Sequence, residues 1–293
     1  MLGVLLSLLA AVAFALVNIL ARVALQHIRP TTGAFLSMVA SLVLALIVAL
    51  VFDFQSFISL SLPAILCFAV AGVVGLAGGR FFIYLAISRL GASRGASIAG
   101  SAPLLAAVLA VLLLHETVNI AIGIGVLFVV GGIWFLTSGN STTGKVRRWD
   151  YVFPLAAATC FALNNIIVKL AVSSFGGPVA GAPVTIFFAM LVLAIPARSA
   201  FNTVTATNMN ANRRSTVFII LAGMASSTAM ILLYLALNLA PVVIVSPLSN
   251  TTPLWTILGA HLFLQRLERV TVRIVLGGLL VVASVAFITI GGA

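Results

Sequence analysis

Apolar runs long enough to cross a membrane follow one another along almost the whole chain, from Leu2 to Ile290. A helix needs about 20 apolar residues to span the hydrocarbon core of a bilayer. The chain is 63% hydrophobic and 6% charged, with a mean hydropathy of +1.31. A water-exposed globular surface over most of the length is therefore excluded. The sequence predicts an all-α integral membrane protein with no soluble domain.

The apolar runs predict ten transmembrane helices in two sets of five. A polar linker at 139–150, with the sequence GNSTTGKVRRWD, separates a first unit at 1–138 from a second unit at 151–293. The ten predicted spans are 2–25, 32–52, 63–87, 95–114, 119–138, 151–172, 182–200, 215–238, 242–264 and 270–290.

The two sets carry matching sequence. AFALVNILAR ends at Arg22 and CFALNNIIVK ends at Lys169; they agree at five of ten positions, among them Asn18 and Asn165. In a second match, a proline follows 19 residues after the tyrosine of a Tyr-Leu-Ala triplet in both halves, at Pro103 and at Pro253. A fixed period of this kind is the signature of a duplicated unit.

The basic residues indicate how the two units enter the membrane. Thirteen of the 15 Lys and Arg lie in or beside the loops that follow odd-numbered spans; the exceptions are Arg80 and Lys169. Basic loops stay in the cytoplasm, so both termini are expected on the periplasmic side of a bacterial inner membrane. Because five is odd, the second unit must be inverted. The net charge of +11 is thereby explained as an orientation signal, and no nucleic-acid partner is expected.

Inverted repeats are a transporter architecture, in which equivalent helices build a central site that opens to each face in turn. Polar side chains in mid-span are its best candidates, because a polar group facing lipid is costly. Asn18, Asn164 and Asn165 are the first of these. Their carboxamides suit a zwitterionic or amide-like solute. Hydrogen bonds between helices explain them equally well.

The spans at 95–114 and 242–264 combine prolines with hydroxyl and amide side chains. Pro247 and Pro253 each remove an amide donor and free the carbonyls of Val243 and Ser249. At membrane depth such carbonyls survive against protein, hydroxyls or a watery cavity, and we favour cavity lining over a packing kink. The polar residues predicted to bind substrate in these spans are Ser97, Ser101, Ser246 and Asn250, and Pro103 repeats the break in the first unit.

Arg80 lies inside the third span, with Tyr84 one turn further on and Tyr234 at the matching place in the second unit. Arg80 either snorkels to the interface or binds a substrate carboxylate. Tyr84, Tyr234 and Trp255 are expected to contact the substrate side chain, although a packed or lipid-facing Trp255 is the alternative. Gly91 and Gly95 are predicted as a pivot between the third and fourth spans.

The four carboxylates of the chain all lie in loops or at span ends, at Asp53, Glu116, Asp150 and Glu268. Proton-driven carriers usually place a titratable group in the path. We therefore favour facilitated diffusion, with a proton-coupled antiporter as the alternative. The three His residues lack ligand spacing, so no metal or cofactor is predicted. An enzyme acting on lipid-linked substrates is a distant alternative, since it would need a cluster of such groups. A passive channel is a third alternative to a carrier.

Each unit has an Asn-bearing first span and a proline-containing fourth span that is followed by an acid, Glu116 or Glu268. In these features the chain resembles the EamA-type family of the drug/metabolite transporter superfamily, and within it the bacterial aromatic amino acid exporters. The resemblance implies a central cavity between the third, fourth, eighth and ninth helices. It also implies export of aromatic and other neutral amino acids and related small metabolites. The sequence is compatible with a monomer.

Overall fold

The computed structural model describes residues 1–24, 30–90, 98–137, 148–204, 213–263 and 272–291. In these ranges the chain is helical apart from short connections, which confirms the predicted all-α class. Among the described residues, five helices are long and apolar enough to cross a membrane, and four shorter apolar helices accompany them. The number of spans stays a prediction.

The described elements, in chain order, are α1 (Leu2–Ala24), α2 (Pro30–Phe52), α3 (Phe54–Ile58), α4 (Leu62–Val70), the π-helix η1 (Ala71–Gly78), α5 (Gly79–Leu90), α7 (Ala102–Leu114), α8 (Ile120–Thr137), the 3₁₀ helix η2 (Arg148–Tyr151), α9 (Val152–Phe175), α10 (Pro178–Val204), α11 (Arg213–Leu239), α12 (Val242–Ser249), α13 (Thr252–Phe263) and α14 (Val272–Gly291).

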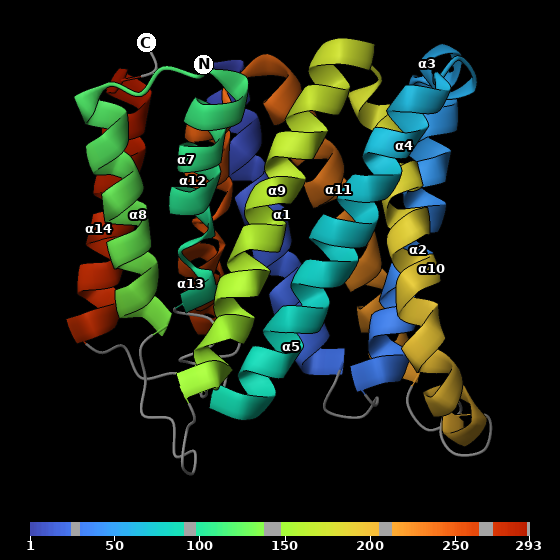
Figure 1. Ribbon diagram of the computed structural model, residues 1–293. Helices are drawn as coiled ribbons and strands as arrows, with labels where there is room; N and C mark the ends of the chain where they lie inside the picture. Colours follow the sequence, from blue (N-terminus) through green and yellow to red (C-terminus); the bar gives the residue numbers. More distant parts are fainter. Residues whose placement is uncertain (25–29, 91–97, 138–147, 205–212, 264–271, 292–293) are drawn as a thin grey trace.

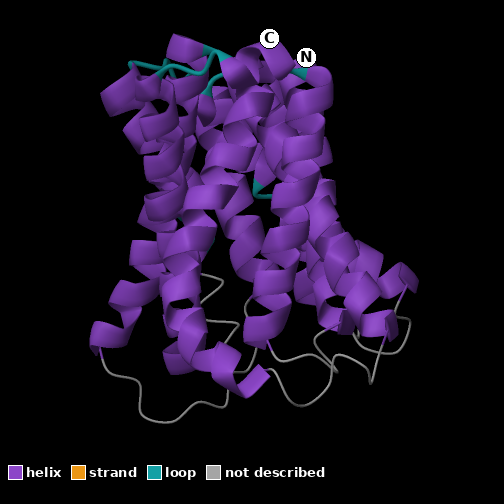
Figure 2. Ribbon diagram, turned by 90° about the vertical axis from the view of Figure 1, so that its right-hand side faces the viewer, coloured by secondary structure: helices purple, strands orange, loops and turns teal. Residues whose placement is uncertain are grey.

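The helices run side by side as one bundle, and both chain termini lie at the same end of it (Figure 1). We call this end the terminal face. The opposite end, where α1, α5 and α8 finish, is called the far face. Turned by 90°, the bundle shows a non-helical segment in its middle, away from both ends (Figure 2).

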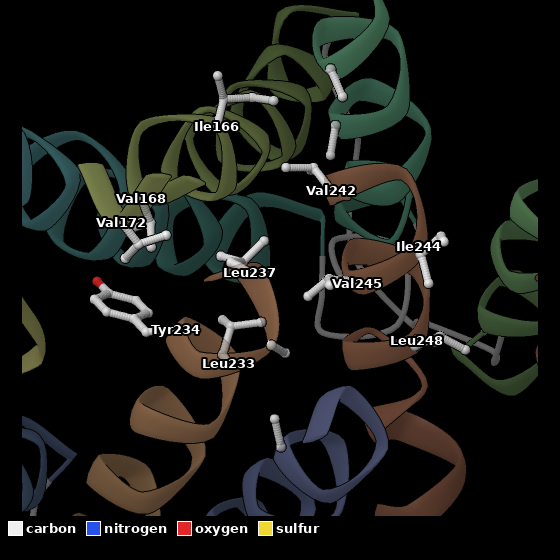
Figure 3. Packing of buried hydrophobic residues seen from close by; sticks show 14 of the residues in the cluster. Ile166, Val168, Val172, Leu233, Tyr234, Leu237, Val242, Ile244, Val245 and Leu248 are labelled. Atoms are coloured by element: carbon white, nitrogen blue, oxygen red, sulfur yellow. The ribbon is translucent and has the colours of Figure 1, made fainter. Parts of the chain in front are cut away.

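The packing of the first half is repeated in the second. α1 packs along α11, and its counterpart α9 packs along η1 and α5, which with α4 make up the counterpart of α11. In the same way α2 packs along α11, and its counterpart α10 packs along α4 and η1. α12 lies at the centre, in contact with α1, α7 and α9, and all eight of its residues are buried. Figure 3 shows its apolar side chains beside those of α9 and α11.

Two glycines allow the closest helix contacts in matching places. A Cβ added at Gly72 of η1 would overlap the backbone carbonyl of Thr185 on α10, and a Cβ added at Gly223 of α11 would overlap that of Ser37 on α2. The two glycines are 151 residues apart and the two carbonyl residues 148 apart. Small residues permit this approach of backbones in membrane helices.

The described helices differ from the predicted spans at several places, of which three bear on the fold and the site. α10 begins at Pro178, before the predicted start at 182, because proline is well tolerated in the first turn of a helix. Residues 148–150, predicted in the linker, belong to η2 instead. Asp150 of η2 forms an ion pair with Arg89 at 3.3 Å. The predicted span 242–264 is divided into α12 and α13.

Candidate functional site

The division between α12 and α13 follows from Pro253. Without an amide hydrogen, Pro253 cannot donate to the Ser249 carbonyl, and the Thr252 hydroxyl donates to it instead at 2.9 Å. Asn250 and Thr251 are non-helical and separate the two helices. Pro247 lies inside α12, and the helix continues past it to Ser249. The break therefore follows Pro247 by three residues.

The first half contains the same break, at Gly100 and Ser101, before Pro103 in α7. There the Ser101 hydroxyl donates to the Ile98 carbonyl at 2.7 Å, as the Thr251 hydroxyl donates to the Leu248 carbonyl at 2.7 Å. The Leu104 amide bonds to the Ser101 carbonyl and the Leu254 amide to the Thr251 carbonyl, both at 3.0 Å. Each of these residues in the first half lies 150 positions before its counterpart in the second half.

Asn165 of α9 contacts α12, on the terminal-face side of the break. Its Nδ2 donates to Ser246 Oγ at 3.1 Å, and both side chains are buried. The Ser246 carbonyl in turn accepts a hydrogen bond from Asn250 Nδ2 at 2.8 Å. Three predicted site residues therefore form one hydrogen-bonded polar group, in which Asn165 and Ser246 are buried and Asn250 is partly buried.

Asn18 of α1 contacts α13, the part of the same broken helix on the far-face side of the break. Its Nδ2 donates to Thr256 Oγ1 on α13 at 3.3 Å, and Asn18 is exposed. The two asparagines occupy equivalent positions in the sequence, and the structure brings both to one segment, one on each side of its non-helical turn.

The exposure of Asn18 is on the inner side of α1. The outer side carries a stripe of exposed apolar residues at Leu2, Leu5, Leu9, Val12 and Leu16. Asn18 points away from this stripe, as do Ser7 and Ala11, which lie nearer the terminal face and are completely buried. The inner side of α1 is thus covered towards the terminal face and uncovered at the depth of Asn18.

Trp255 lies beside the turn, whereas Asn164, the neighbour of Asn165 in the sequence, faces η1. Trp255 Nε1 donates to Thr251 Oγ1 at 3.2 Å, which holds the ring against the turn. Asn164 packs against Gly75 of η1, where an added Cβ would overlap its side chain. Its Oδ1 is buried and has no hydrogen-bond partner among the described residues.

Tyr234 lies apart from this group. It is fully buried, donates its hydroxyl to Thr185 Oγ1 at 2.9 Å and stacks on Phe68 with ring centroids 6.0 Å apart. In Figure 3 its hydroxyl points away from Val245 and Leu248 of α12. Its surroundings are those of a core residue of α4, α10 and α11.

The remaining predicted site residues are placed in part. Arg80 lies partly buried in α5, and Tyr84 belongs to the same helix, with its side chain outside what the structure describes. Ser97, Gly91 and Gly95 lie outside the described residues. Within the described ranges no group of three His, Cys, Asp or Glu could hold a metal ion.

Thr256 and Thr251 are not among the residues predicted from the sequence. Thr256 is the partner of Asn18, and Thr251 holds both the turn and Trp255. Their position in the Pro-containing span was the available signal. Hydroxyl side chains that bond to carbonyls of their own helix are common in such spans, so composition alone did not distinguish them.

Comparison with known proteins gives the family and the fold. The model of the EamA-like transporter family matches residues 1–138 and 148–290. A solved structure titled "Crystal structure of protein" shares the fold, with a TM-score of 0.76 and 17% identity over 99% of this chain and 97% of that one. No curated protein sequence matches. The resemblance inferred from the sequence is confirmed: the chain is a multi-pass membrane protein that belongs to the EamA-like transporter family.

Proposed function

We propose that the protein is a carrier that exports neutral amino acids, aromatic ones among them, and related small metabolites across the bacterial inner membrane. The two units are inverted repeats, and the site at their seam opens to each face in turn. The observation that carries the proposal is the broken helix α12–α13, which is contacted by an asparagine from the first helix of each unit.

Three relationships support the internal repeat on which this proposal rests. The hydrogen bonds at Ser101 and Thr251 are the same at an offset of 150 residues. The contacts of Gly72 and Gly223 are equivalent. The family model matches the chain in two stretches whose boundary falls in the predicted linker.

The burial of α1 supports a site that is closed towards the terminal face and open towards the far face. Arg89, Arg213 and Arg214 lie at the far face, whereas Asp53 and Glu116 lie at the terminal face. By the charge rule the far face is cytoplasmic. The structure then corresponds to a carrier ready to load substrate from inside the cell.

In this proposal Asn18 and Thr256 bind the polar end of the substrate, and Trp255 contacts its side chain. Arg80 is the candidate for the carboxylate, with Tyr84 beside it. Tyr234 supports the packing of α11. The acids of the described ranges, Asp53, Glu116 and Asp150, lie at the ends of the bundle, which favours facilitated diffusion over proton exchange.

Proteoliposomes loaded with labelled Phe, Thr or Met test the proposal. Unlabelled amino acid outside should accelerate the efflux of labelled amino acid, and the rate should be the same at two pH values. Efflux equal to that from liposomes that are loaded with the same amino acid but lack the protein would contradict a carrier. Efflux that responds to a proton gradient would replace facilitated diffusion by proton exchange.

A further inference from the structure

The turn between α11 and α12 is held at the terminal face by two charged side chains of opposite sign. Lys169 of α9 donates its Nζ to the carbonyls of Leu237 at 2.7 Å and Ala240 at 3.1 Å. Glu116, in the connection between α7 and α8, accepts the amide of Val242 at Oε1, at 2.8 Å, and that of Val243 at Oε2, at 3.0 Å.

Each charge meets the helix end that favours it. The last carbonyls of α11 have no partners within the helix and carry the negative end of its dipole, which attracts a cation. The first amides of α12 carry the positive end of the α12 dipole, which attracts an anion. Bonds to charged groups are stronger than bonds between neutral ones. Lys169 and Glu116 therefore fix seven residues of backbone, 237–243, from two other elements.

A third element closes on the same turn. Gly3 of α1 packs against Ala240, where an added Cβ would lie 2.7 Å from the Ala240 Cβ. Ser7, one turn further along α1, is completely buried. If α12 moves away from α9 to uncover the seam at the terminal face, the bonds from Lys169 and Glu116 must break. Ser7 lies on the same side of α1 as Gly3, which contacts the α11–α12 turn, so we expect Ser7 to become exposed.

We infer that Glu116 and Lys169 form a clasp that keeps the terminal face closed and positions α12, the helix that carries Ser246. The inference rests on the proposed carrier function, in which this face opens once per cycle. Glu116 and Lys169 are positioning residues: they act through the α11–α12 turn and touch no substrate. Weakening either charge should shift the carrier towards the state that is open at the terminal face.

Side-specific labelling of a cysteine tests the clasp. The full chain, with Cys67→Ala and Cys160→Ala, carries Ser7→Cys as the probe, and a membrane-impermeant thiol reagent is added at the terminal face. Glu116→Gln and Lys169→Met should each raise the labelling rate about tenfold, because each removes a charge-assisted interaction from a two-state equilibrium. Lys169→Arg, which keeps the charge and the donors, should restore slow labelling.

Two controls separate opening of the clasp from loss of structure. Asp53→Asn removes an acid at the same face whose side chain caps no helix amide, and should leave labelling of Ser7→Cys unchanged. Ser284→Cys, buried in α14, should stay unlabelled in all variants. Unchanged labelling of Ser7→Cys, or an equal rise at Ser284→Cys or with Asp53→Asn, overturns the inference. The assay needs no substrate, so a negative efflux assay would refute the carrier function without altering this result.

Discussion

Asn165 donates its side-chain amide to Ser246 Oγ at 3.1 Å, across the interface between α9 and α12, where both residues are buried. Asn165 is the counterpart of Asn18 in the sequence, and Asn18 donates to Thr256 of α13, on the other side of the helix break. One bond is enclosed and the other is exposed. In the proposed carrier, the enclosed bond lies on the closed side of the break and the exposed bond lies on the open side.

Asn165→Ala should lower the stability of the protein by about 1 kcal/mol, because Ser246 Oγ loses its donor in a buried position. Ser246→Ala should have a similar effect, and the double variant should cost less than the sum of the two. Thermal unfolding in detergent measures all three. Thr159→Ala, at an exposed position of the same helix, is the control. Strictly additive effects would mean that the bond contributes nothing.

Asn18→Ala and Thr256→Val should raise the KM for efflux about tenfold while leaving the unfolding temperature unchanged, because this pair is exposed and its loss opens no cavity. Leu16→Ala, on the outer stripe of α1, should change neither value. Efflux kinetics in proteoliposomes make the comparison. An unaltered KM for both variants would remove the pair from the substrate site.

The sequence predicted the helical class, the family and the repeated Asn and Pro positions, because these depend on hydropathy and spacing along the chain. It did not predict which groups meet. Asn18 and Thr256 are 238 residues apart, and only the packing of α1 on α13 brings them together. Tyr234 shows the same limit: a tyrosine in an apolar span can face a cavity or, as here, a threonine in the core.

Pro253→Ala should impair transport without destabilising the protein. The new amide can donate to the Ser249 carbonyl, so α12 and α13 can join into one helix and the turn at Asn250 and Thr251 is lost. Pro103→Ala should do the same at the first break. Efflux rate and unfolding temperature are measured together. Full activity in both variants would show that the breaks are not needed for transport.

Gly72→Ala should destabilise the protein by about 1–3 kcal/mol, because its Cβ would overlap the Thr185 carbonyl and a backbone contact cannot yield easily. Gly223→Ala should lower the stability by a similar amount, because its Cβ would overlap the Ser37 carbonyl. Gly123→Ala is the matched control, since an added Cβ there meets nothing within 4 Å. Unfolding in detergent gives the ranking, and equal stability of all three would contradict the packing described for η1 and α11.

The inverted repeat is tested most directly by finding the faces at which equivalent positions of the two units emerge. Gln55 follows α2, the second long helix of the first unit, and Thr203 lies in the last turn of α10, the corresponding helix of the second unit. In a chain with Cys67→Ala and Cys160→Ala, an impermeant thiol reagent should label Gln55→Cys in intact cells. It should label Thr203→Cys only after the cells are made permeable. Labelling of both from the same side would contradict an inverted repeat, and with it the carrier built on it.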